Sequence, residues 1–368
     1  MKTTENVPHY QSLASALVDI FGKKVAIINT DRVSGGDINK AYALTLNTGD
    51  KIFMKANAKD CASFFTAEAE GLNAIKSTKT IETPEIICTG TDDGEEVGYS
   101  FLLLRYLKSR EPDEKFWETF AEQLANLHKA DTSRFFEENS GGKSKGGEEV
   151  TAEGSDKSKT GHKFYGFPKD NFIGRTRQQN RMEPAAESDK TTGTDNSTET
   201  GKEAGSSTFN KTGQPFFSSW IDFFRQNRLE VQFKKAEKNF SEGELKKITK
   251  LLDSLEKIIV EPEKPSLLHG DLWRGNLMCT EQKGGKSQTP VLIDPAVYVG
   301  NREADIAMTE LFGGFPEEFY QAYRASFPLE PGYEERRDLY NLYHLLNHLN
   351  LFGQSYLEPV LSIVDEYL

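Results

Sequence analysis

Short apolar runs divide the first hundred residues at intervals typical of β-strands. The runs are Val25–Ile28, Ala41–Leu46, Ile52–Lys55, Ile86–Cys88 and Tyr99–Leu104, with a hairpin turn at Asn47–Asp50. Between the third and fourth runs, Phe64–Ile75 carries apolar residues at helical spacing. This pattern predicts a small, mostly antiparallel sheet accompanied by one helix.

Beyond Leu107 the apolar residues recur at three- and four-residue intervals, which is the period of an amphipathic helix. The segments with this period are 116–128, 217–235, 245–259 and 336–368. We therefore expect an α+β chain with two lobes. A sheet-rich lobe would span residues 1–107, and a larger helical lobe would span residues 108–368.

Two stretches interrupt the helical part. Residues 137–162 and 183–213 contain no Leu or Ile and are rich in Gly, Ser, Thr, Lys and Glu. Such sequences bury too little apolar surface to offset the entropy lost on ordering. We expect both to be flexible surface insertions.

Charge narrows the range of partners. The chain of 368 residues has a formal net charge of −12 and a pI of about 5.2. A nucleic-acid binder needs a basic face, so we expect no nucleic-acid partner, and an acidic chain is also disfavoured on anionic membranes. No apolar run approaches the length of a bilayer span, and the first residues lack the apolar core of a signal peptide. We therefore expect a cytoplasmic protein. Its oligomeric state stays open.

One stretch carries a specific chemistry. His269-Gly-Asp-Leu-Trp273 places Asp271 five positions before Asn276, and a further apolar run ends at Asp294. Phosphoryl transfer to an alcohol needs an acceptor for the hydroxyl proton and a few oxygen ligands for Mg²⁺ beside the phosphates. This spacing predicts Asp271 as the catalytic base and Asn276 and Asp294 as the metal ligands of an ATP-dependent kinase.

A second group would hold the nucleotide. Lys55 follows an apolar strand and Glu68 lies thirteen residues later at the start of the predicted helix, as expected of a phosphate-binding Lys steadied by a helical Glu. Gly35 and Gly36 allow backbone amides to approach phosphate oxygens, although a Gly-Gly pair is more often a plain turn. Trp273 is either a core residue or a wall of the acceptor site.

Together these residues resemble the fructosamine kinases, or ketosamine-3-kinases, within the aminoglycoside-phosphotransferase-like kinases. The segments that carry the resemblance are Gly35–Asn39, Phe53–Lys55, Glu68–Leu72, Asp170–Gly174, Arg228-Leu229, His269–Trp273, Gly275-Asn276, Ile293–Ala296, Arg302–Asp305, Leu311–Phe315 and Leu342–His348. The resemblance covers nearly everything outside the two insertions.

This resemblance implies a bilobal, protein-kinase-like fold with ATP and Mg²⁺ as cofactors. It implies phosphorylation of the C3 hydroxyl of ketosamines, as small molecules or on glycated proteins, with deglycation as the outcome. It also implies a hinge at Arg105, Tyr106 and Leu107 that holds adenine. Asn171 and His269 are further candidates for substrate contact, although His269 more often has a structural hydrogen-bonding role.

Two alternatives stay open from the sequence. The first is a kinase for another alcohol, such as an aminoglycoside or choline, and the second is a catalytically silent pseudokinase that acts as a binding module. The chain also departs from the family pattern at Arg274, Arg175, Arg177 and Gln179, where small residues and prolines are usual. We expect these positions on the acceptor side, so substrate preference is less determined than the chemistry.

Overall fold

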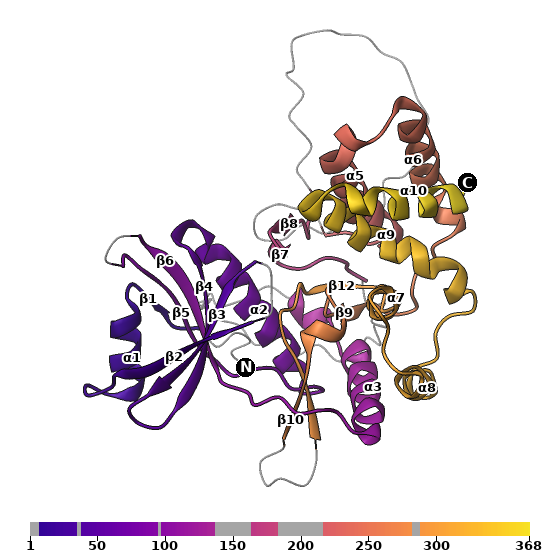
Figure 1. Cartoon of the computed structure of the whole chain (residues 1–368). Helices are drawn as coiled ribbons and strands as arrows, with labels where there is room; N and C mark the ends of the chain where they lie inside the picture. The colour runs from indigo at the N-terminus through magenta and orange to yellow at the C-terminus, as the bar shows by residue number, and fades with distance from the viewer. Residues whose placement is uncertain (1–6, 35–37, 95–96, 137–162, 183–215, 282–287) are drawn as a thin grey trace, which may run out of the picture.

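The computed structural model describes residues 7–34, 38–94, 97–136, 163–182, 216–281 and 288–368. It has two lobes, a sheet-rich smaller lobe from the N-terminal part of the chain and a larger, mainly helical lobe (Figure 1). The predicted glycine loop at Gly35 and Gly36 and the predicted insertions at 137–162 and 183–213 lie outside the described residues.

The smaller lobe is built on a six-stranded sheet with the order β1-β5-β6-β4-β3-β2. The strands are β1 (His9–Tyr10), β2 (Ile27–Val33), β3 (Lys40–Leu46), β4 (Lys51–Ala58), β5 (Ile86–Asp92) and β6 (Tyr99–Arg105). Every neighbouring pair is antiparallel except β1 and β5, which are parallel. The predicted, mostly antiparallel sheet is therefore confirmed.

The prediction of a single helix in this lobe is wrong, because α1 (Leu13–Phe21) precedes the expected α2 (Ala62–Thr78). The Ser12 hydroxyl caps α1 by accepting a hydrogen bond from the amide of Ser15. The helix buries only Ala16 and Leu17, because it lies on one face of the sheet. The helix is only nine residues long, and a short apolar run of this kind cannot be told from a strand by periodicity alone.

Two strand predictions need adjustment. The run at 25–28 belongs to β2, which begins at Ile27 and continues through charged residues to Val33 because it is an exposed edge strand. Lys55 was expected to end its strand, but β4 continues to Ala58 and places Lys55 in the middle of the sheet, opposite Leu102. Its side chain is therefore buried.

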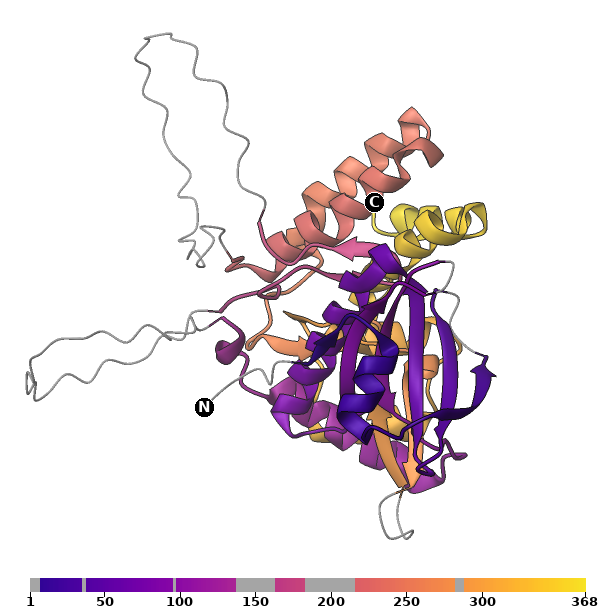
Figure 2. The ribbon, with the colours of Figure 1, turned by 90° about the vertical axis from the view of Figure 1, so that its left-hand side faces the viewer.

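The larger lobe contains the predicted helices and others between them. They are α3 (Glu114–Lys129), α4 (Trp220–Phe224), α5 (Val231–Ala236), α6 (Glu242–Ser254), α7 (Glu303–Leu311), α8 (Glu317–Ser326), α9 (Tyr333–Phe352) and α10 (Leu357–Glu366). The predicted helix over 217–235 is interrupted by a π-helical segment, Arg225–Glu230. The predicted segment 336–368 divides into α9 and α10 at Gly353, whose φ of 92° ends α9. Helices α6 and α10 lie side by side in both views (Figures 1 and 2).

Three short antiparallel strand pairs position the loops of this lobe. They are β7 (Asn171–Ile173) with β8 (Thr176–Gln178), β9 (Ser266–Leu268) with β12 (Tyr298–Gly300), and β10 (Leu277–Glu281) with β11 (Gln288–Leu292). The segment with Asp271 runs between β9 and β10, and Asp294 lies between β11 and β12. Both loops therefore emerge next to each other from paired strands.

Apolar packing holds the larger lobe around α3, whose Phe120 contacts Phe319 of α8 with ring centroids 5.1 Å apart. The two lobes also meet through rings, because Phe64 of α2 lies 4.3 Å from Phe172 of β7. None of the helices in the described part of the chain combines the length and apolar character that a membrane span requires.

Candidate active site

A cavity of about 900 Å³ lies where the two lobes meet. Among the predicted site residues that the structure describes, those that line it are Lys55, Glu68, Arg105, Tyr106, Leu107, Asn171, Asp271, Trp273, Asn276 and Asp294. These residues come from β4, α2, the end of β6, β7 and the loops after β9 and β11. The fold therefore gathers side chains up to 239 positions apart in sequence.

The side of the cavity formed by the smaller lobe is ionic. The ammonium of Lys55 donates to Glu68 Oε1 at 2.6 Å and also to Asp294 Oδ1. Burial by itself lowers the pKa of Lys55, but the two carboxylates outweigh burial and raise it above its usual range. Burial raises the pKa of Glu68, and the ion pair with Lys55 acts against that rise. The predicted Lys–Glu pair is present, with Glu68 in the second turn of α2 and not the first.

Asp294 has an uncommon backbone conformation. Its φ is 54°, a left-handed value that Asp adopts more readily than most residues but at some cost. This turn comes two residues after β11 ends, and the amide of Ile293 donates to the carbonyl of Asn276 at 3.1 Å. The strained turn thus aims the Asp294 carboxylate at the cavity and fixes its loop beside Asn276.

Asp271 faces the same cavity from the larger lobe. The side-chain amide nitrogen of Asn276 donates to the Asp271 backbone carbonyl at 2.8 Å and to its carboxylate at 3.0 Å. Burial raises the pKa of Asp271 to about 7, the hydrogen bond from Asn276 opposes this, and the charge of Asp294 adds to the rise. A carboxylate with few donors around it is a suitable proton acceptor near neutral pH.

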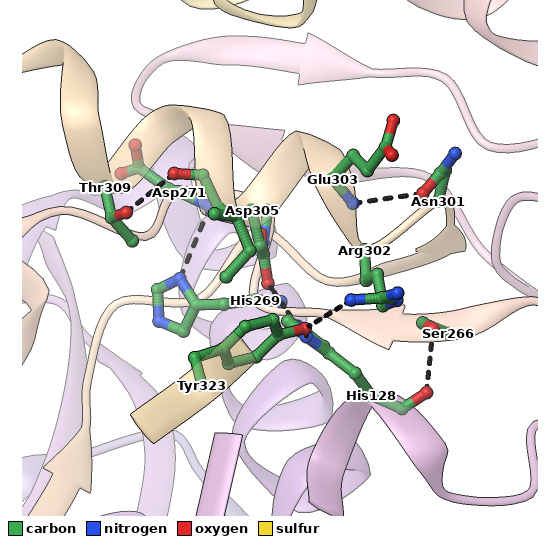
Figure 3. Close-up of polar contacts among 12 residues, drawn as sticks. His128, Ser266, His269, Asp271, Asn301, Arg302, Glu303, Asp305, Thr309 and Tyr323 are labelled. Carbon is green, nitrogen blue, oxygen red and sulfur yellow. Dashed lines mark hydrogen bonds and ion pairs between the residues drawn. The ribbon is translucent and has the colours of Figure 1, made fainter. Parts of the chain in front are cut away.

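Behind this loop lies a buried polar network (Figure 3). Asp305 of α7 accepts from the backbone amides of His269 and Gly270 at 2.7 and 2.9 Å, and from His128 at 3.2 Å. Burial alone raises the pKa of Asp305, but these hydrogen bonds outweigh it and hold the pKa below its usual value. The ring of His128 also bonds the hydroxyl of Tyr323 at 2.7 Å. Asp305 therefore fixes the backbone on which Asp271 is mounted.

A glycine is required at position 270. Its φ is 80°, and a Cβ there would lie 2.1 Å from the carbonyl oxygen of Ala296. The loop passes so close to that backbone because the amide of Ala296 donates to the carbonyl of His269 at 2.9 Å. Any side chain would separate the two loops that carry Asp271 and Asp294.

His269 and Asn171, the two candidates for substrate contact, are both bonded within the protein. His269 is fully buried and does not line the cavity, because its Nε2 donates to the carbonyl of Ile293 at 2.9 Å. Asn171 lines the cavity, but its amide nitrogen donates to Val297 at 2.7 Å and its oxygen accepts from Gln178 at 2.7 Å. Both side chains are better placed to hold loops than to bind a substrate.

Trp273 and Arg274 point to different places. Trp273 is 39% exposed and lines the cavity, so it is a wall residue and not part of the core. The expectation that Arg274 belongs to the acceptor side is wrong, because its guanidinium lies 4.6 Å from the ring of Trp117 in α3. Arg177, which was also expected on the acceptor side, forms an ion pair with Asp170 at 2.6 Å.

Sequence reasoning did not assign Asp305 and His128 to the site. Asp305 stood within a segment that resembles the family, but nothing in the spacing linked it to the loop 35 residues earlier. His128 lies at the end of an amphipathic helix and reads there as an ordinary core residue. Only the tertiary fold brings these side chains behind the loop that carries Asp271.

Comparisons with known proteins agree with this geometry. The sequence profile described as fructosamine kinase matches residues 9–143 and 204–368. A relative from Synechocystis named probable ketoamine kinase is 33% identical over 366 residues, covering 98% of this chain and 97% of its own. The protein-ribulosamine 3-kinase of Arabidopsis thaliana, named as chloroplastic, is 32% identical, covering 94% of this chain and 85% of its own.

The fold also matches a solved structure. The crystal structure of a candidate fructosamine-3-kinase from Haemophilus somnus superimposes with a TM-score of 0.68 at 27% identity, covering 97% of each chain. The prediction of a bilobal, protein-kinase-like α+β fold is confirmed.

Proposed function

The chain belongs to the fructosamine kinase family, and we propose that it transfers the γ-phosphoryl group of ATP to the C3 hydroxyl of a ketosamine. The observation that supports this most is the single cavity that Lys55 and Glu68 line from one lobe and Asp271 and Asn276 line from the other. A phosphoryl-transfer site needs both groups at once, because positioning and electrostatic stabilisation supply nearly all of the catalysis.

Asp271 would act as the general base. Its carboxylate faces the cavity and receives one side-chain hydrogen bond, from Asn276, so the other oxygen can accept the proton of a hydroxyl group. As the hydroxyl oxygen forms its bond to the γ-phosphorus, the bond from that phosphorus to the ADP oxygen breaks, and ADP leaves. The proton stays on Asp271 until solvent or product removes it.

The donor set fits Mg²⁺. Asn276 uses its amide nitrogen for Asp271, which leaves its oxygen as a ligand, and Asp294 has a second carboxylate oxygen beyond the one that bonds Lys55. Within the described ranges no three His, Cys, Asp or Glu side chains gather into a cage. Mg²⁺ commonly takes only one or two protein carboxylates or amides together with phosphate oxygens, and there it neutralises the charge of the phosphates.

Lys55 would hold the α- and β-phosphates, with Glu68 fixing its position from α2. The adenine would lie at the opposite end, against the backbone of Arg105, Tyr106 and Leu107 where β6 ends. The complete ionic set at the cavity counts against a silent pseudokinase, because a protein that transfers no phosphoryl group needs none of these charges there. Family membership favours a ketosamine over an aminoglycoside or choline as the acceptor.

The product of this reaction explains a role in deglycation. A phosphate on C3 lies next to the C2 carbonyl of the ketosamine, so it is prone to elimination. Loss of a proton from C1 gives an enaminol that expels phosphate from C3 and leaves an imine at C1, and hydrolysis of this imine by water releases the amine that carried the sugar. We propose small ketosamines, or lysine ketosamines of glycated proteins, as substrates.

An acceptor panel tests the proposal. The protein would be incubated with ATP, Mg²⁺ and, in separate reactions, fructose-lysine, ribulose-lysine, an aminoglycoside or choline, while ADP release and acceptor phosphorylation are followed. Turnover with at least one ketosamine is expected. Turnover of the aminoglycoside or choline alone would replace the proposal with the other-alcohol kinase, and nucleotide binding without any transfer would favour the pseudokinase.

A further inference from the structure

Four aromatic side chains gather at the end of the cavity formed by the larger lobe. They are Phe312 after α7, His348 and Phe352 of α9, and Tyr356, and all four line the cavity. The His348 ring lies 4.9 Å from Phe312, 5.3 Å from Phe352 and 5.1 Å from Tyr356 between centroids. We call this group the aromatic subsite.

The subsite has an exposed ring that packing does not explain. Phe352 is 50% exposed, one of the largest exposures among the apolar residues of the described chain. Large apolar side chains left open at the wall of a concave site are more often ligand contacts than surface residues placed by chance. The nucleotide parts identified above use none of these four residues.

The subsite belongs to the same cavity as Asp271. Helix α7 carries Asp305, which holds the catalytic loop, and then Met308 and Phe312, which both line the cavity. With a rise of ~1.5 Å per residue, Phe312 lies about 10 Å beyond Asp305 along the helix direction. Because Met308 and Phe312 both line the cavity, the cavity follows this part of the helix as far as the aromatic subsite.

This part of the cavity has no free cation among the described lining residues. Lys55 is bound to two carboxylates, and Arg105 lies at the hinge end, where it pairs with Glu85 at 3.4 Å. The rings present negative faces, and Asp271 adds a carboxylate at the near end. The electrostatics thus favour a neutral or cationic group over an anionic one.

His348 adds a hydrogen-bond acceptor to the rings. Its Nδ1 lies 2.8 Å from the carbonyl of His344, and because a carbonyl can only accept, Nδ1 carries the proton. The neutral ring then has Nε2 as an acceptor. Burial lowers the pKa of His348, which favours this neutral form.

We propose that the aromatic subsite binds the aliphatic amine chain that a ketosamine carries on its sugar nitrogen. This inference rests on the proposed function. The nitrogen is bonded to C1, two carbons from the C3 hydroxyl at Asp271, so its substituent leaves the sugar close to the base and extends along the cavity. Methylene groups pack on the rings, and the positive charge of the amine is attracted to their faces.

The test compares two ketosamines that share a sugar. One is the fructosamine of a lysine side chain, and the other is 1-amino-1-deoxyfructose, which has no chain. For Phe352→Ala we expect KM for the lysine ketosamine to rise about tenfold with kcat nearly unchanged, a size typical of lost apolar pocket contacts. KM for 1-amino-1-deoxyfructose and for ATP should stay near the wild-type values.

Val18→Ala is the matched control, since Val18 is an exposed apolar residue of α1 with 42% exposure, and it should change neither KM. Tyr356→Ala, which removes another ring of the subsite, should also raise KM for the lysine ketosamine and leave KM for 1-amino-1-deoxyfructose unchanged. Equal KM increases for both ketosamines, or no increase for either, would overturn the inference while leaving the proposed function intact. If the wild-type protein phosphorylates neither ketosamine, the proposed function fails and the subsite assignment fails with it.

Discussion

Asp271 and Asp305 lie on the two faces of one loop, and their surroundings give them opposite properties. Asp271 faces the cavity with one side-chain donor, and burial raises its pKa to about 7. Asp305 is enclosed by two backbone amides and His128, and its pKa is held below the usual value although burial opposes this. Two identical side chains are thus separated by their hydrogen bonds into the proposed proton acceptor and a fixed anchor.

The comparison teaches how the site divides its tasks. In the proposed reaction, a hydroxyl group and the phosphates would complete the surroundings of the Asp271 carboxylate on the front face. The back face has no such partner, and there Asp305 and both ring nitrogens of His128 are bonded within the protein itself. Substitutions on the two faces should therefore separate activity from stability.

The largest effect should come from Asp271→Asn. An amide cannot accept the hydroxyl proton, so kcat should fall by about a thousandfold or more, within the usual range for a positioned general base. The amide oxygen can still accept from Asn276, so thermal stability and ATP affinity should hardly change. Steady-state kinetics, calorimetric nucleotide binding and thermal denaturation together check this. Near-normal turnover would show that Asp271 is not the base.

Asp305→Asn should act on both properties. The amide is a poorer acceptor for the His269 and Gly270 amides and leaves His128 without its charged partner, so the unfolding free energy should fall by about 2–4 kcal/mol. The loosened loop should also reduce kcat. Denaturant titration measures the first effect, and Asp222→Asn, at an exposed ion pair, is the control that should change stability little. If Asp305→Asn kept the wild-type stability, Asp305 would not be the anchor of this loop.

Protonation of the buried His344 should also destabilise the protein in acid. Burial lowers the pKa of His344 to about 3, so below about pH 6.5 the unfolded chain binds a proton that the folded chain excludes. Between pH 7 and pH 5 this one residue should remove about 2 kcal/mol of unfolding free energy. In His344→Phe the loss measured by denaturation at the two pH values should be smaller by that amount. An unchanged pH dependence would show that His344 is protonated in the fold.

The smallest effect should come from Arg274→Ala. Its guanidinium packs on Trp117 outside the cavity, so stability should change by less than about 1 kcal/mol and KM for the acceptor should stay close to the wild-type value. The adjacent Trp273→Ala, which removes a cavity wall, should raise that KM about tenfold. Acceptor kinetics on the two variants side by side decide this, and a larger KM effect in Arg274→Ala would return Arg274 to the acceptor side.

The residues that line the front face could be named from the sequence because their spacing is local, and the roles proposed for them stay predictions. Asp271, Asn276 and Asp294 follow a loop spacing, and Lys55 with Glu68 follows a strand–helix spacing, so residue types and intervals were sufficient. The back face was not predictable because Asp305 and His128 meet the loop only through the packing of α3, α7 and β9. A buried polar residue within a helix gives no sequence signal of the backbone groups that it will bond.

The helices and strands also divide into those that the sequence predicted and those that it did not. Long segments such as 116–128 and 64–75 were predicted as helices because they repeat their apolar residues over several turns. Helix α1 was missed because it has only nine residues, and the edge strand β2 was displaced because its residues are exposed and leave no buried face. The π-helical segment at 225–230 contains Arg228, which is fully buried against Tyr298, and no periodicity predicts it.

The most direct test of the central claim is the position of the phosphate on the product. Fructose-lysine would be incubated with ATP and Mg²⁺ and with the wild-type protein or Asp271→Asn, and the acceptor would be examined by phosphorus–proton correlation NMR. We predict one phosphate monoester coupled to the proton on C3 in the wild-type reaction and none with Asp271→Asn. A phosphate on another hydroxyl, or an equal yield from the variant, would contradict the assignment of this site as a ketosamine-3-kinase with Asp271 as its base.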